Sequence, residues 1–173
     1  MKIALIVLGV LLAIPLGLAA VGAMLPRRHT ASRRLSLRAA PERVFALLAD
    51  HAGAAAWRSD VKRVEVVGGT PERPVFVEHG KHGPIRYEVM EAEKPRRYVT
   101  RVADETLPFG GRWIWELAPS ATGTLLTITE DGEVKPPIFR ALARFVFGYT
   151  STMDSVLGDL ARHLGEDAQP QAV

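Results

Sequence analysis

An apolar segment at the start of the chain does most to limit how this protein can fold. From Ile3 to Leu25 the sequence contains no charged residue, and the segment is long enough to cross a bilayer as one helix. Pro15 is tolerated in such a helix and would kink it. We therefore expect a transmembrane segment over residues 3–25, followed by one soluble domain of ordinary size.

Two interpretations of this segment stay open. The small residues AVGA at 20–23 fit a signal-peptide cleavage site, which would leave a secreted or periplasmic domain. The length of the run and the arginines after it favour an uncleaved single-pass anchor with a cytoplasmic domain, because positive charge beside a span tends to stay in the cytoplasm. Residues 26–31 would then be a basic linker at the membrane. The arginines predicted to contact lipid headgroups are Arg27, Arg28, Arg33 and Arg34.

Composition excludes several functions. The chain has no cysteine, so disulfides, thiolate metal sites and a cysteine nucleophile are ruled out. Its formal net charge is only +3, and the arginines next to the apolar segment account for the excess. Because no basic stripe interleaved with aromatic residues is present, nucleic acid is not an expected partner.

The domain opens with a strand and two short helical pieces, and then continues as strands. Alternation in SRRLSLRA places Leu35 and Leu37 on one face of the first strand. Pro41 marks a helix start, and a second helical piece ends near Trp57. Six alternating segments then follow, from Val61 onward, separated by turns rich in glycine and proline. They predict neighbouring antiparallel strands, and a sheet of about six or seven strands in all.

The last element is predicted as one long amphipathic helix over residues 137–164. Apolar residues recur along it at steps of three and four and so form one stripe: Ile138, Leu142, Phe145, Tyr149, Met153, Val156 and Leu160. Phe147 lies off this stripe, without explanation from the sequence. Residues 166–173 are expected to be a disordered tail. A run of strands with helices at both ends predicts an α+β fold.

Two tryptophans stand one residue apart in the fifth of these six segments. Side chains alternate across a strand, so Trp113 and Trp115 share one face, and the charged Arg112 and Glu116 share the other. The tryptophan face is therefore expected to be the concave one, under the last helix. Rings of this size either fill an ordinary core or border a space kept for a ligand, and both interpretations remain open.

The order of elements and several motifs resemble the START-like (SRPBCC) superfamily, and within it the polyketide cyclase/dehydrase and lipid-transport family. One phrase of that family is matched here by Ala40, Val44, Phe45, Leu48, Asp50 and Trp57. A later strand–turn–strand feature is matched by Leu117, Pro119, Gly123 and Thr124. The resemblance covers residues 32–165. The chain departs from many relatives at GAAAW, where they carry Trp or Pro before the tryptophan.

The resemblance implies a helix-grip fold, in which a curved antiparallel sheet wraps around the C-terminal helix and leaves a hydrophobic cavity. Family members bind lipids, sterols, quinones or aromatic polyketides, and a minority are enzymes. The implied partner is thus a hydrophobic small molecule. The candidate cavity residues come from the concave face, the second helical piece and the helix stripe: Trp57, Tyr87, Trp113, Trp115, Leu142, Phe145, Tyr149 and Met153.

No catalytic constellation, metal set or cofactor motif is recognisable, so we expect no catalytic residue, no metal and no cofactor. His79 and His82 lie in a predicted hairpin turn, where a metal would need a third ligand from elsewhere. Asp104 and Glu105 form an acid pair in a predicted loop, where carboxylates are commonly solvated.

Three functions fit these observations. The first is a membrane-anchored binding domain that holds a lipid, isoprenoid or aromatic polyketide-like molecule. The second is a cyclase/aromatase- or hydrolase-type enzyme on the same fold, for which Tyr87, Tyr149 and His79 are the polar candidates. The third is a ligand-free interaction module. The volume and polarity of the space between sheet and helix distinguish the three.

Overall fold

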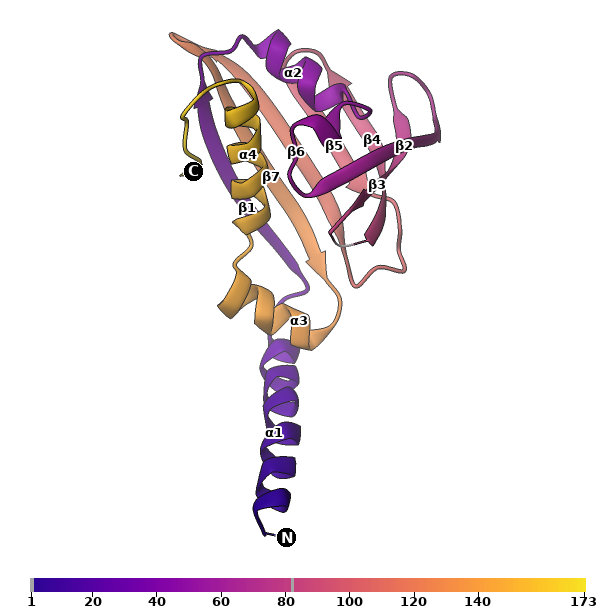
Figure 1. The fold of residues 1–173 in the computed structure, drawn as a ribbon, viewed down its shortest axis with the longest axis vertical. Coiled ribbons are helices and arrows are strands. Elements are labelled where there is room, and N and C mark those ends of the chain that lie inside the picture. The colour runs from indigo at the N-terminus through magenta and orange to yellow at the C-terminus, as the bar shows by residue number, and fades with distance from the viewer. Residues whose placement is uncertain (1, 82) are drawn as a thin grey trace.

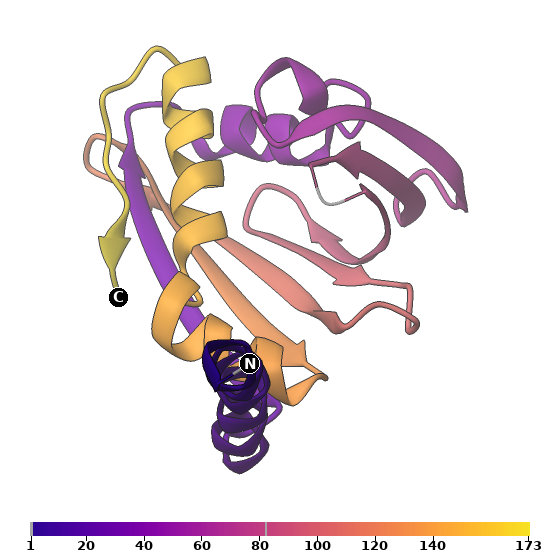
Figure 2. The same ribbon diagram turned by 60° about the horizontal axis from the view of Figure 1, so that its bottom comes forward.

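The computed structural model describes residues 2–81 and 83–173, with the backbone alone at residues 3–10 and 12. A helix, α1 (Lys2–Met24), projects from one end of an α+β domain built on a curved sheet (Figures 1 and 2). Pro15 lies inside α1. Judged on the part of the chain that is described, no helix is both long enough and apolar enough to cross a membrane.

The sheet is antiparallel throughout and has the strand order β2-β3-β4-β5-β6-β7-β1-β8. Its strands are β1 (Arg28–Leu37), β2 (Val61–Gly69), β3 (Pro74–Gly80), β4 (Gly83–Glu93), β5 (Arg97–Val102), β6 (Phe109–Ser120), β7 (Gly123–Val134) and β8 (Gln171–Ala172). The α+β class, the antiparallel sheet and the six consecutive strands after the helical pieces are confirmed. The predicted count of six or seven strands is corrected to eight.

The eighth strand lies in the segment that was expected to be a disordered tail. β8 pairs with Arg33 and Arg34 of β1, which would otherwise be the edge of the sheet. The carboxylate of Glu166 accepts hydrogen bonds from the backbone N–H groups of Arg38 (2.7 Å) and Ala39 (3.0 Å). The tail prediction is wrong because a free strand edge offers backbone partners that composition does not reveal.

The single helix predicted over residues 137–164 is wrong. The segment forms α3 (Pro137–Leu142), a π-helical turn η2 (Ala143–Phe147) and, after a break, α4 (Ser151–His163). Gly148 stands at the break with φ 73° and ψ 162°, a conformation that is essentially restricted to glycine. Apolar residues keep helical spacing on both sides of the break because each helix packs on a partner. α3 packs on α1, whereas α4 packs on β1 of the sheet.

The core lies between the inner face of the sheet and two helices, α2 (Pro41–Ala49) and α4 (Figure 2). α2 begins at Pro41, as predicted, and is followed by the short helix η1 (Ala54–Ala56). The residues that meet in this core come from β1, α2, the strands β3 to β7, and α4, and include Leu35, Leu37, Phe45, Leu126, Ile128, Val156 and Leu160. This packing fixes which side chains line the concave face.

α1 and α3 meet at the base of the domain (Figure 1). A Cβ atom at Gly22 would clash with the carbonyl oxygen of Pro137, so the helices approach at a glycine. Arg140 of α3 is buried and donates a hydrogen bond from Nη1 to the Leu25 carbonyl at 2.7 Å. That carbonyl lies just past the end of α1, where backbone acceptors lack helical partners. The contact therefore caps α1 and ties it to the domain.

Candidate functional site

Five of the residues predicted to line a ligand cavity lie in or against the core between the concave face and the helices. Trp115 and Met153 are buried in the core, and Trp57, Tyr87 and Trp113 are half-buried against it. The two neighbouring indoles share this face, as strand alternation predicts, with ring centroids 5.8 Å apart at 66°. Trp115 is only 5% exposed, so it lies deeper than Trp113.

The other three candidates do not join this group. Leu142 belongs to α3, and Phe145 is 66% exposed on η2, both on the far side of the helix break. Tyr149 follows Gly148 and stacks on the imidazole of His29, with ring centroids 3.9 Å apart. The break at Gly148 therefore divides the predicted stripe, and only its α4 part faces the aromatic residues.

A carboxylate links Trp113 to this histidine. Glu130 of β7 accepts a hydrogen bond from the Trp113 indole at 3.1 Å, and its other oxygen lies 3.2 Å from Nε2 of His29. His29, Glu130 and Trp113 occupy three adjacent strands, β1, β7 and β6. Together with the ring of Tyr149 they place a polar and aromatic cluster at one end of the concave face.

A second polar pair lies between the sheet and α2. The phenol oxygen of Tyr98 is 2.8 Å from Nε2 of His51, whose ring stacks on Phe76 with centroids 3.9 Å apart. Burial lowers the pKa of His51 from 6.5 to about 4, although the nearby Asp50 carboxylate acts in the opposite direction. Burial also raises the pKa of the Tyr98 phenol. Both groups are therefore neutral at pH 7.

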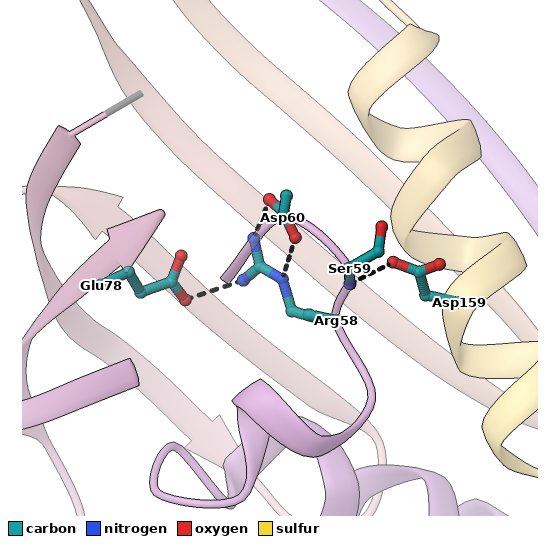
Figure 3. A network of polar contacts seen from close by, with 5 residues as sticks. All are labelled: Arg58, Ser59, Asp60, Glu78 and Asp159. Atoms are coloured by element: carbon teal, nitrogen blue, oxygen red, sulfur yellow. Dashed lines mark hydrogen bonds and ion pairs between the residues drawn. The ribbon is translucent and has the colours of Figure 1, made fainter. Parts of the chain in front are cut away.

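An ion cluster joins the start of β2 to β3 (Figure 3). Arg58 donates two hydrogen bonds to Asp60, at 3.1 and 2.8 Å, and a third to Glu78 at 2.7 Å. Burial by itself would lower the pKa of the Arg58 guanidinium, but the two carboxylates outweigh it and the pKa is raised. Burial raises the pKa of Glu78, an effect that Arg58 only partly offsets. The guanidinium of Arg58 therefore stays charged, and the two carboxylates hold it in a half-buried position.

Two further contacts tie this cluster to its surroundings. The backbone N–H of Ser59 donates to Asp159 of α4 at 2.7 Å, so the cluster is attached to the helix (Figure 3). Burial, followed by the charge of Glu78, raises the pKa of the Tyr87 phenol, which therefore stays protonated. Within the described part of the chain, the indole N–H of Trp57 is buried without an acceptor.

Two hollows of about 450 Å³ and 410 Å³ lie beside the C-terminal segment. One is lined by residues of β1 and the tail, among them Ser36, Arg38 and Glu166. The other runs along α4, beside Asp154 and Asp159. None of the eight candidate cavity residues lines either hollow. The side chains of the concave face thus define the candidate site.

Of the histidine and acid pairs of the predicted turn and loop, the described residues His79, Asp104 and Glu105 do not come together as a site. His79 lies on β3, 3.4 Å from an Arg63 nitrogen, while His82 is outside the described residues. Asp104 is half-buried and accepts hydrogen bonds from Thr106, which lower the pKa of its carboxyl. Glu105 engages Lys135 through its backbone carbonyl. No cluster suited to a metal occurs among the residues described here.

The arginines after α1 separate into two groups. Arg27, Arg28 and Arg34 are exposed. Arg33 instead points inward, where it donates to Asp154 of α4 at 2.8 Å and to Thr150 at 3.0 Å. That side chain holds β1 to the start of α4, so it is engaged within the domain.

Solved structures with the same fold place this architecture in a known class. The two-domain aromatase/cyclase BexL matches with a TM-score of 0.63 and 15% identity, over 83% of this chain and 52% of that one. The Zhui aromatase/cyclase from Streptomyces sp. R1128 matches with a TM-score of 0.57 and 17% identity, over 79% and 96%. A protein of Thermus thermophilus matches with 0.57 and 24%, over 79% and 93%. The domain therefore shares its fold with these three proteins.

The family follows from the sequence itself. The family described as "polyketide cyclase / dehydrase and lipid transport" matches residues 28–165, which is most of the chain, and the protein belongs to that family. A search of curated proteins gives no match. The family and the structural neighbours together support a ligand-binding domain.

Proposed function

We propose that the concave face binds one hydrophobic small molecule that carries a polar oxygen, such as a fatty acid, an isoprenoid alcohol or an aromatic polyketide-like compound. The observation that carries this proposal is the composition of that face. Half-buried aromatic rings at Trp57, Tyr87 and Trp113 offer apolar contact, and fixed polar groups stand among them. Binding sites for such ligands combine mostly apolar walls with a few placed polar groups.

The unpaired indole of Trp57 supports the polar part of this ligand. A buried donor without an acceptor costs about 1–3 kcal/mol, and a ligand oxygen would remove that cost. Tyr87 adds a protonated hydroxyl on the same face. The proposed entry route is past the half-buried Trp113, which lines neither of the two hollows described above. A movement of Trp113 that opens this route would break its edge contact with Trp115 and one hydrogen bond to Glu130.

We further propose that α1 anchors this domain in a membrane, with the domain on the cytoplasmic side. The proposal rests on the uncharged sequence from Ile3 to Leu25 and on the arginines that follow it. The large apolar side chains of Leu16 and Met24 on α1 are exposed, as a lipid-facing helix requires. Tethering lets the domain exchange an apolar ligand with the bilayer without carrying it through much water.

Native mass spectrometry tests the binding proposal. The full chain is purified in a mild detergent, from which it is released in the gas phase. The test variant is Trp113→Ala, on the inner face of β6. Arg112→Ala, on the outer face of the same strand, is its matched control. We expect a stoichiometric lipophilic adduct on the parent and on Arg112→Ala, and its loss from Trp113→Ala. An adduct retained by all three proteins would contradict a site on the concave face.

An enzyme is the second candidate, and the His51–Tyr98 pair favours it. The half-buried His51 and the buried Tyr98 make a neutral hydrogen-bonded pair beside the aromatic face, and such a pair can pass a proton. Two of the structural neighbours are aromatase/cyclases, and for this chain the same reaction class is a proposal. Conversion of a bound polyketide-like compound by the parent protein, and its absence in His51→Gln, would favour this candidate over simple binding.

A further inference from the structure

The segment between α3 and the helix break carries a large apolar surface that the fold leaves uncovered. Phe145, Val146 and Phe147 of η2 are 66%, 65% and 64% exposed, and Phe139 of α3 is 50% exposed. Exposed aromatic residues scattered singly are ordinary, but a contiguous group of this size marks an interaction surface. We call these four residues the η2 patch.

The position of the η2 patch points to what covers it. α3 packs directly on the C-terminal end of α1, through the Gly22–Pro137 approach and the hydrogen bond from Arg140 to Leu25 (Figure 1). The patch is therefore continuous with the end of the apolar helix. Gly148 then turns the chain back to the sheet, so η2 leaves the core instead of packing into it.

The charges around the patch agree with a lipid surface. Arg144 lies within η2 and is exposed, with its guanidinium 5.9 Å from the centre of the Phe145 ring. Arg27 and Arg28 are exposed immediately after α1. Aromatic side chains flanked by arginine are what an interfacial segment presents to the headgroup and acyl boundary of an anionic bilayer.

We infer that the η2 patch inserts into the surface of the same bilayer that α1 enters, so that the domain is held at two points rather than by a flexible tether. The inference rests on the proposed anchor and adds an orientation to it. Tyr149 and His29 stand just behind the patch, so this end of the concave face would lie next to the lipid. A ligand would then pass between bilayer and domain over a short path.

Spin labels can test this directly, because the chain has no cysteine of its own. The full chain is reconstituted into vesicles of phosphatidylcholine with a minority of phosphatidylglycerol, and single labels are placed through Phe147→Cys, Ile14→Cys and Val66→Cys. Ile14 reports on the anchor, and Val66 is a matched exposed apolar residue on β2. The measured quantity is the accessibility of each label to oxygen relative to a water-soluble nickel chelate.

We expect the oxygen-to-nickel ratio at Phe147→Cys to be several-fold higher than at Val66→Cys and to approach that at Ile14→Cys. Equal ratios at residues 147 and 66, with a high ratio at residue 14, would overturn the inference and leave the anchor standing. A low ratio at residue 14 would refute the anchor, and the inference with it. Dipolar broadening between labels at residue 147 would show that a second copy of the chain covers the patch, which also overturns the inference.

Discussion

Trp115 and Trp113 differ in depth, and the difference gives a prediction at the scale of single residues. Trp115 is enclosed by the core, so Trp115→Ala should lower the free energy of unfolding by about 3–5 kcal/mol. Trp113 is half-buried, so Trp113→Ala should cost clearly less stability while weakening the binding of a fluorescent fatty acid. Urea unfolding and probe titration of both variants check this. Equal, large stability losses with unchanged probe binding would make both tryptophans ordinary core residues.

The Arg58 cluster gives a second prediction. Arg58→Met leaves the carboxylates of Glu78 and Asp60 half-enclosed without their cation, which should cost about 3 kcal/mol of stability. Arg97→Met removes an arginine that pairs with Glu116 in a more exposed place, and should cost about 0.5 kcal/mol. Chemical denaturation of the two variants makes the comparison. Similar losses would mean that the Arg58 cluster adds little to the fold.

His51 should make the stability of the domain depend on pH. Its pKa is lower in the folded chain, about 4 against 6.5, so between these values the unfolded chain binds more protons. The stabilisation is therefore complete above pH 6.5 and is lost as the pH falls toward 4, by up to about 3 kcal/mol. His51→Gln removes this group, so its unfolding free energy should fall less over the same range. Parallel curves for the two proteins would contradict the assignment.

Sequence reasoning located some of these residues and missed others, for physical reasons. The face shared by the two tryptophans follows from strand alternation alone. His29 was missed because β1 begins at Arg28, before the predicted strand, although His29 has the same parity as Leu35. Arg58 carries no such signal. Its partner Asp60 is only two residues away, but Glu78 is brought to it by the fold.

At the scale of elements, the break in the C-terminal segment is the feature with the largest consequences. Gly148→Ala should destabilise the domain by about 1–3 kcal/mol, because the backbone conformation of Gly148 is open almost only to glycine. No neighbouring atom lies within 4 Å of an added Cβ, so the whole cost comes from the backbone and none from a steric clash. Gly158→Ala is the matched control inside α4, where it should stabilise by about 0.5–1 kcal/mol. Thermal unfolding of the two variants measures both changes in stability. A change of the same sign in both would contradict this explanation of Gly148.

The elements themselves were predictable where a local period decides them. Six alternating segments became six consecutive strands, and Pro41 starts α2. The C-terminal segment was not predictable as a broken helix, since its apolar residues keep helical spacing while facing different partners on the two sides of Gly148. The short strand β8 was hidden because its pairing depends on an open edge of β1 rather than on its own residues.

At the scale of the whole molecule, we propose that the concave face of this START-like domain takes a hydrophobic ligand and that its base lies at a membrane. Removal of the ligand should then loosen the face without unfolding the sheet, because Trp113 and Tyr87 lie outside the most buried part of the core. Hydrogen exchange before and after delipidation should show faster exchange in β4 and β6, with β7 unchanged. Unchanged exchange in every strand would argue against a ligand on this face.

The central claim is that a ligand occupies the concave face, and fluorine NMR of the tryptophans tests it most directly. The chain has three tryptophans, and all of them lie in or against the core behind this face. The full chain is labelled with 5-fluorotryptophan, delipidated and titrated with oleic acid, farnesol or a hydroxynaphthoquinone. We predict that at least one of these probes shifts the resonances of Trp57 and Trp113 strongly and that of the deeper Trp115 less. Three resonances that stay in place through saturating amounts of every probe would contradict the claim.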